Sequence, residues 1–152
     1  MRDTLLWAET GRLTPPQCRK ILSFGLDLGG AVRLAREYGV KMATGTDYIM
    51  REQHGKNLEE LALMRQAGMT VEEVLLAATI GGAELCGVDA DYGRVAPGYV
   101  FDAIILDQDP GDLSAFGSPG LVTGVFKMGR AEVVHERFAD AGLPGAVAGI
   151  GR

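Results

Sequence analysis

The fold class is indicated by one short run, Gly39-Val40-Lys41-Met42-Ala43-Thr44-Gly45-Thr46-Asp47. Residues 40–44 are short, largely apolar and bounded by glycine on both sides, which is typical of a buried strand in an α/β unit. Helices are predicted before and after this strand, and that order indicates an α/β fold. Asp47 then follows the carboxyl end of the strand, where α/β folds build their sites.

A helix is predicted to begin at Thr14-Pro15-Pro16-Gln17. The threonine is a suitable N-cap, proline suits the first helical position, and the glutamine has the capping-box spacing. Gly25 and the pair Gly29-Gly30 are expected to weaken or kink the middle of the helix. Gly39 is a natural end for it.

Two further helices are predicted after Asp47. Asn57-Leu58-Glu59-Glu60 and Thr70-Val71-Glu72-Glu73 both have the capping-box spacing, so we expect a helix to begin at each. The first is expected to end at Gly68. The second is expected to break at Gly81-Gly82, before a short helical turn that ends near Gly87.

The chain after Val88 is predicted to be rich in β-structure. Short apolar and β-branched runs at 93–95, 101–106 and 121–128 are separated by glycine and proline, and Met128-Gly129-Arg130 has a hairpin signal. Residues 139–152 are rich in Gly and Ala and lack periodicity, so a flexible tail is expected there.

Composition excludes several classes of partner. The 152 residues are 47% hydrophobic and carry a net charge of -5, which gives no overall attraction for nucleic acid or an anionic membrane. No run is apolar enough to span a membrane, and no glycine-rich phosphate motif is present.

Cys18 and Cys86 lie far apart, without the spacing of a zinc or redox motif. A cytoplasmic location is the default expectation, although a signal peptide on a longer precursor would not be visible here.

Residues from the predicted strand onward resemble a known protein family. The run 39–47 and the following His54-Gly55-Lys56-Asn57-Leu58-Glu59-Glu60-Leu61 are similar to the last barrel strand and the next helix of the metal-dependent amidohydrolase superfamily. The imidazolonepropionase-like and prolidase-like branch is the closest in appearance. The resemblance extends over residues 33–134, in the family's order, through Ala67-Gly68-Met69-Thr70, Ala77-Ala78-Thr79, Gly82-Ala83-Glu84-Leu85-Cys86-Gly87, Gly93-Arg94-Val95-Ala96-Pro97-Gly98 and Phe101-Asp102-Ala103-Ile104-Ile105-Leu106-Asp107.

The resemblance implies a (β/α)8 barrel that holds one or two divalent ions, usually zinc, with a small β-sandwich built from both chain ends. Residues 1–87 would be the C-terminal part of the barrel, residues 88–137 a segment of the sandwich, and residues 138–152 a flexible tail. The family's metal ligands are a His-x-His pair after the first strand, a Lys or Glu after the fourth, histidines after the fifth and sixth, and an Asp after the eighth. Asp47 matches this last residue, which binds or neighbours the metal and accepts the proton of the attacking water.

The sequence departs from this pattern in its histidines and its length. It contains two histidines, His54 and His135, and no His-x-His pair, so it does not supply the other ligands. A (β/α)8 barrel typically needs about 250 residues. We therefore expect the C-terminal part of an amidohydrolase, whether truncated, proteolysed or encoded as a piece, that is inactive alone. The divalent ion belongs to the complete protein, and this chain by itself is not expected to form the full metal site.

Several other residues have both a functional and a structural interpretation. His54 lies in the loop after Asp47, either as a substrate contact or as a histidine that fixes the start of the next helix. Thr46 and Tyr48 flank Asp47 and either touch substrate or satisfy nearby backbone groups. A structural role is favoured for His135 and for the acidic residues Asp102, Asp107 and Asp109.

The leading hypothesis is a piece of a metal-dependent hydrolase that cleaves amide or cyclic-amide C–N bonds in a small-molecule or peptide-like substrate. One alternative is a split enzyme, in which another polypeptide supplies the rest of the barrel. A second alternative is a non-catalytic α/β module that assembles or binds a partner through an uncovered face. Recognisable strands that leave a sheet open favour self-association, so a homo-oligomer or association with the missing barrel portion is expected.

Overall fold

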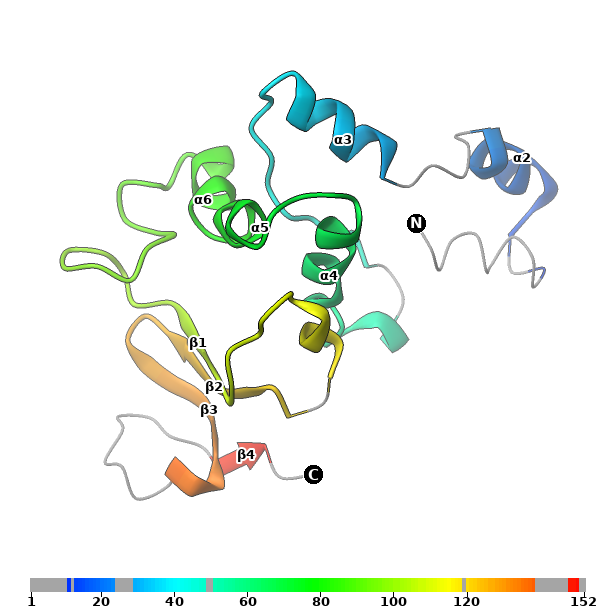
Figure 1. The fold of residues 1–152 in the computed structure, drawn as a ribbon. Coiled ribbons are helices and arrows are strands. Elements are labelled where there is room, and N and C mark those ends of the chain that lie inside the picture. Colours follow the sequence, from blue (N-terminus) through cyan, green and yellow to red (C-terminus); the bar gives the residue numbers. More distant parts are fainter. Residues whose placement is uncertain are drawn as a thin grey trace.

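The computed structural model describes residues 11, 13–23, 29–48, 51–118, 120–138 and 148–150. A group of short helices lies beside a small sheet, and α2 stands apart from both (Figure 1). The predicted α/β class is confirmed, with an open sheet rather than a closed barrel. No helix in the described ranges is long and apolar enough to cross a membrane.

The predicted first helix is divided into two. The helices are α2 (Pro15–Ser23) and α3 (Gly30–Glu37), and residues 24–28, where Gly25 was expected to weaken the helix, lie outside the described residues. At the start of α2 the Thr14 N–H donates to Gln17 Oε1 over 2.9 Å, one half of the predicted capping box. Gly39, with φ of 64°, ends this helical region as predicted.

Three short helices follow in the middle of the chain. They are α4 (Glu59–Gln66), α5 (Val71–Ala78) and α6 (Ile80–Cys86), preceded by the single turn η1 (Arg51–Gln53). The capping box of α5 is confirmed, because the Thr70 N–H donates to Glu73 Oε2 and the Glu73 N–H donates to Thr70 Oγ1. Gly87, with φ of 69°, ends α6 as predicted.

Two details of these helices differ from the prediction. The start of α4 is capped by Leu58 rather than Asn57, with no side-chain hydrogen bond, so the Asn57 side chain does not act as the cap. The break between α5 and α6 falls at Thr79, which has φ of -123° and ψ of -96°, and Gly81-Gly82 lie inside α6. Gly81 suits the first turn of α6, because this turn packs closely against the backbone carbonyls of Met42 and Leu76.

The second half of the chain forms a sheet in chain order. The strands are β1 (Ala103–Leu106), β2 (Val122–Lys127), β3 (Arg130–His135) and β4 (Ala148–Ile150), with η2 (Ser114–Gly117) between β1 and β2 and η3 (Glu136–Phe138) after β3. The first three are antiparallel, and β4 runs parallel to β3 within the segment where a flexible tail was expected. The expected run at 93–95 forms no strand in the described structure.

The predicted hairpin between β2 and β3 is present. Lys127 pairs with Arg130, which leaves Met128 and Gly129 as a two-residue turn. Their φ values of 51° and 76° are both positive, as a type I′ turn requires. Asp102 supports the turn, because its Oδ1 accepts the Met128 N–H over 2.6 Å and its Oδ2 accepts Lys127 Nζ.

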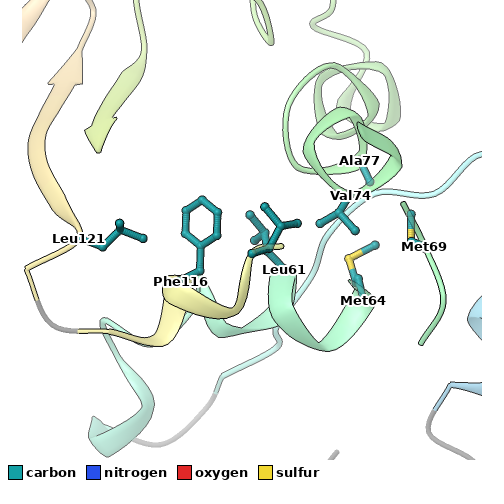
Figure 2. Close-up of a cluster of buried hydrophobic side chains, with 8 residues drawn as sticks. Leu61, Met64, Met69, Val74, Ala77, Phe116 and Leu121 are labelled. Carbon is teal, nitrogen blue, oxygen red and sulfur yellow. The ribbon is translucent and has the colours of Figure 1, made fainter. Parts of the chain in front are cut away.

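One hydrophobic core connects the helices with the loop before β2. Phe116, from η2, lies next to Leu61 of α4 (Figure 2). The buried members of this core come from α4, α5, the connection between these two helices, and residues 113–121, and they are Leu61, Met64, Met69, Val74, Ala77, Leu113, Phe116 and Leu121. A second, smaller cluster lies on β2 and β3 and consists of Phe126, Ala131 and Val134.

The predicted strand at 40–44 is wrong. Residues 40–48 are extended but pair with no strand in the described part of the chain, and Val40 is 56% exposed. A strand is defined by its ladder partners, and the described residues place none beside this segment. The segment is held instead against α3 and α5.

Candidate active site

The segment that carries Asp47 is fixed at two points by backbone hydrogen bonds. The Val40 N–H donates to Ala35 O over 2.8 Å, which joins the segment to the end of α3. The Thr44 N–H donates to Ala77 O over 3.2 Å, which joins it to the last turn of α5. Residues 40–44 therefore run along the helices, and Asp47 follows three residues beyond the second point.

Asp47 is exposed and has a left-handed backbone, with φ of 47°. Few residues other than glycine adopt this conformation, and Asp is among those that tolerate it. The neighbours Thr46 and Tyr48 are half-buried. Asp47 is thus exposed at the end of an extended segment, whereas the sequence predicted it at the carboxyl end of a buried strand.

His54 lies in the turn between η1 and α4. Its backbone N–H donates to Arg51 O over 3.2 Å, and its side chain is exposed. Gln53, immediately before it, is only 8% exposed and anchors this turn. The described structure has no hydrogen bond between His54 and Asp47, so the two predicted site residues are not joined directly.

Two ion pairs join α3 and the start of the Asp47 segment to α5 and α6, respectively. Arg36 Nε lies 3.0 Å from Glu73 Oε2, and Arg36 Nη1 donates to Gly68 O over 2.7 Å. Lys41 Nζ lies 2.8 Å from Glu84 Oε2, and this hydrogen bond raises the pKa of Lys41. The hydrogen bond from the Thr70 N–H, with a smaller contribution from Arg36, lowers the pKa of Glu73.

Sequence analysis did not find these ion pairs. Arg36 and Glu73 are 37 residues apart, and Lys41 and Glu84 are 43 apart. No local spacing links charges at such separations. The only available signal was that each charge lies on or next to a predicted helix.

The carboxylates of Asp102 and Asp109 support turns in the β-rich half. Asp102 supports the hairpin, and the adjacent Lys127 ammonium, followed by the Met128 N–H, holds its pKa below the usual value. Asp109 Oδ1 accepts the Gly111 N–H over 2.8 Å within a turn. Asp107 lies in the chain just after β1, where its own N–H donates to Leu121 O. His135 is the half-buried last residue of β3.

The described residues do not fit a complete metal site. Within the described ranges, no group of three His, Cys, Asp or Glu side chains is close enough together to hold an ion. Asp47 offers one carboxylate, whereas a catalytic zinc is usually held by three protein ligands. The arrangement can contribute a ligand or a proton acceptor, and the remaining groups have to come from elsewhere.

Comparison with known proteins places these features in one family. The model of the amidohydrolase family matches residues 27–133, which include Asp47 and His54. No curated protein sequence shows a significant match.

Three solved structures illustrate the likeness. An amidohydrolase structure is 27% identical, with a TM-score of 0.73, over 86% of this chain and 32% of its own. A Xaa-Pro dipeptidase with methionine bound in its active site is 30% identical, with a TM-score of 0.70, over 83% and 31%. A prolidase in complex with N-methylphosphonate-L-proline is 25% identical, with a TM-score of 0.72, over 82% and 31%. The chain therefore spans about a third of the length of the structures that it matches.

Proposed function

Because this chain belongs to the amidohydrolase family, we propose that it forms part of a metal-dependent hydrolase that cleaves the amide bond of small peptide-like substrates. The likeness to a Xaa-Pro dipeptidase and a prolidase supports a dipeptide with a C-terminal proline as the substrate to test first. The single observation that carries the proposal is the family match across residues 27–133, within which Asp47 lies exposed beyond an extended segment.

Asp47 is proposed as the general base. The oxygen of a water molecule bonds to the amide carbon, and the Asp47 carboxylate takes up the proton that the water loses. The C–N bond then breaks, and the proton passes to the leaving nitrogen. The exposure of Asp47 supports this role, since a carboxylate must be reached by both water and substrate. Its left-handed backbone is a conformation that clusters at functional sites.

Three neighbours are proposed to contact substrate. Thr46 and Tyr48 are half-buried residues that flank Asp47, and a hydroxyl group can donate or accept a hydrogen bond with a peptide group. His54 projects from a turn anchored by Gln53, and its exposed ring is available to a substrate carboxylate. If one of these three residues has only a structural role, its substitution should lower the stability of the fold and leave KM unchanged.

The family uses divalent metals, and zinc is the metal that we propose for the complete protein. Asp47 would be its only ligand from the described residues, so other ligands are proposed to come from outside them. They lie either in a longer polypeptide or in a separate chain. We further propose that residues 1–87 belong to the barrel, residues 88–137 to the small sandwich and residues 138–152 to a tail.

A non-catalytic module is the second candidate, and one observation favours it. Leu76 of α5 is 49% exposed, and Val40, which lines the same groove, is 56% exposed. Apolar side chains on this face are suited to burial against another surface. Either the missing barrel portion or another copy of this chain is proposed to cover them.

The test uses the protein isolated from its native source, where mass spectrometry shows whether the sequence lies in a longer chain or with a partner. Asp47→Asn is expected to lower kcat for a Xaa-Pro dipeptide by about 10²–10⁴-fold. Asp91→Asn, an exposed aspartate of the turn after α6, is the matched control and should leave kcat unchanged. An unaltered kcat in Asp47→Asn would refute the general-base role.

The 152-residue chain is tested alongside. It is expected to show neither turnover nor stoichiometric zinc by elemental analysis. Turnover that depends on Asp47, with tightly bound zinc, would overturn the proposal that other residues are required. The second candidate instead predicts no hydrolysis from either material and an oligomer in analytical ultracentrifugation.

A further inference from the structure

The contact between the Asp47 segment and α6 leaves no room for a side chain at one position. Gly81 lies in the first turn of α6, and a Cβ atom built on it would lie 2.8 Å from Met42 O and 3.1 Å from Leu76 O. Cβ atoms essentially never approach other atoms within 3.0 Å. Both neighbours are backbone carbonyls, so rotating a side chain does not relieve the clash.

We infer that Gly81 is a positioning residue for Asp47: the missing side chain lets the extended segment rest on α6, and this contact sets where the carboxylate lies. The inference rests on the proposed function of Asp47 for its catalytic meaning. The placement itself is a property of the described structure and is tested without any reaction.

The contact at Gly81 lies close to one backbone hydrogen bond and one ion pair that join the segment to helices. Met42 is two residues from Thr44, whose N–H bonds to Ala77 O, and one residue from Lys41, which pairs with Glu84 of α6. The Met42 carbonyl thus sits between an anchor on α5 and an anchor on α6. A shift of this carbonyl therefore strains the Thr44 hydrogen bond first and then moves the residues that follow it.

The expected shift is large enough to matter. Opening the contact from 2.8 Å to an ordinary 3.4 Å moves the two backbones apart by about 0.6 Å. Functional groups need to be held within about 0.5 Å of their productive geometry. Asp47 follows Met42 by five residues of extended chain, with Thr44 as the intermediate anchor.

The surroundings allow the variant to fold with the segment displaced. A cavity of about 350 Å³ lies along the same contact and is lined in part by Val40, Met42, Leu76 and Ile80. Val40 on this segment is 56% exposed, so the segment is not enclosed and can shift when a methyl group is added. Gly82, the next residue of α6, provides a matched control, because its added Cβ would lie 3.8 Å from Ala77 O, which is ordinary contact.

The experiment records amide NMR spectra and hydrogen exchange of the 152-residue chain with Gly81→Ala or Gly82→Ala. Gly81→Ala is expected to move the Thr44 and Asp47 amide resonances and to lower the protection of the Thr44 amide about five- to tenfold. Gly82→Ala is expected to leave both unchanged. If Gly81 has only a structural role, Gly81→Ala should lower the melting temperature without moving the Asp47 resonance. That result would overturn the inference.

A second measurement covers the case in which Gly81→Ala does not fold. In the unmodified chain the Thr44 amide should exchange more slowly than expected for an unstructured peptide, and fast exchange would overturn the inference directly. If Gly81→Ala moves Asp47 while Asp47→Asn in the native enzyme leaves kcat unchanged, the placement stands and the proposed function fails.

Discussion

Leu113 combines a fully buried side chain with a backbone that favours glycine, and this makes a sharp prediction. Its side chain is 0% exposed in the core shared with α4 and α5, and its φ is 70° with ψ of 1°. The left-handed conformation costs a residue with a Cβ about 1–2 kcal/mol. Burial of the leucine side chain offsets that cost.

Two substitutions separate the side chain from the backbone. Leu113→Ala removes the buried side chain and keeps the strain, so the free energy of unfolding should fall by about 3 kcal/mol. Leu113→Gly removes the same side chain and also the strain, although glycine adds about 0.5–1 kcal/mol of entropy cost. The glycine variant should therefore be the more stable of the two by about 0.5–1 kcal/mol.

Leu61 provides the matched control. It is 5% exposed in the same core but lies within α4, where glycine is less stable than alanine by about 1 kcal/mol. Leu61→Gly should therefore be less stable than Leu61→Ala, the reverse of the order at Leu113. Urea unfolding followed by circular dichroism measures all four variants. An alanine variant more stable than the glycine variant at both positions would refute the left-handed conformation of Leu113.

Three further predictions concern a helix start and a turn. Thr70→Ala removes the N-cap of α5 and should lower the free energy of unfolding by about 1 kcal/mol, or the melting temperature by about 2–4 °C, in thermal unfolding at pH 7. Because the folded state lowers the pKa of Glu73, its contribution is complete above the unfolded value of 4.5 and is lost as the pH falls through the lower folded pKa. Glu73→Gln should thus flatten the dependence of melting temperature on pH below about 4.5, and an unchanged slope would contradict this. Met128→Asn should stabilise the hairpin, because asparagine suits the positive φ of the first turn residue, whereas Gly129→Ala should destabilise it; equal melting temperatures would argue against a type I′ turn.

Most features set by neighbours in the chain were predicted correctly from the sequence, and the cap expected at Asn57 is an exception. The Thr70 capping box, the helix ends at Gly39 and Gly87, and the hairpin at 128–130 depend on residues within a few positions of one another. Their backbone conformations and hydrogen bonds are local, so the residue types are sufficient to indicate them.

Features set by distant contacts were not predicted correctly. The segment 40–44 has the composition of a strand, but no described strand lies beside it to form a ladder. Gly81-Gly82 reads as a helix break, whereas the structure uses Gly81 for a close approach of the Met42 carbonyl. The left-handed Leu113 has no local signal, because only its burial among residues of α4 and α5 offsets the strain.

In the candidate site, too, features set by distant contacts were not predicted correctly from the sequence. The sequence predicted Asp47 after a buried strand, and the structure instead places it after an extended segment that pairs with no described strand. The ion pairs of α3 and of this segment, Arg36 with Glu73 and Lys41 with Glu84, join residues 37 and 43 positions apart. Residue spacing along the chain does not determine such pairs.

The hydrophobic core that joins Leu61 and Val74 to Leu113, Phe116 and Leu121 also determines how the molecule should come apart. The proposed boundary between the barrel part and the sandwich part lies between residues 87 and 88. Leu61 and Val74 come before it and the other three residues come after it, yet all five lie in one hydrophobic core. Cleavage by a protease in the 88–100 connection should therefore leave the two products associated, as in a fragment complementation system. Expressed separately, each piece should aggregate through its uncovered half of that core. The two halves are thus expected to unfold in one cooperative transition rather than one after the other.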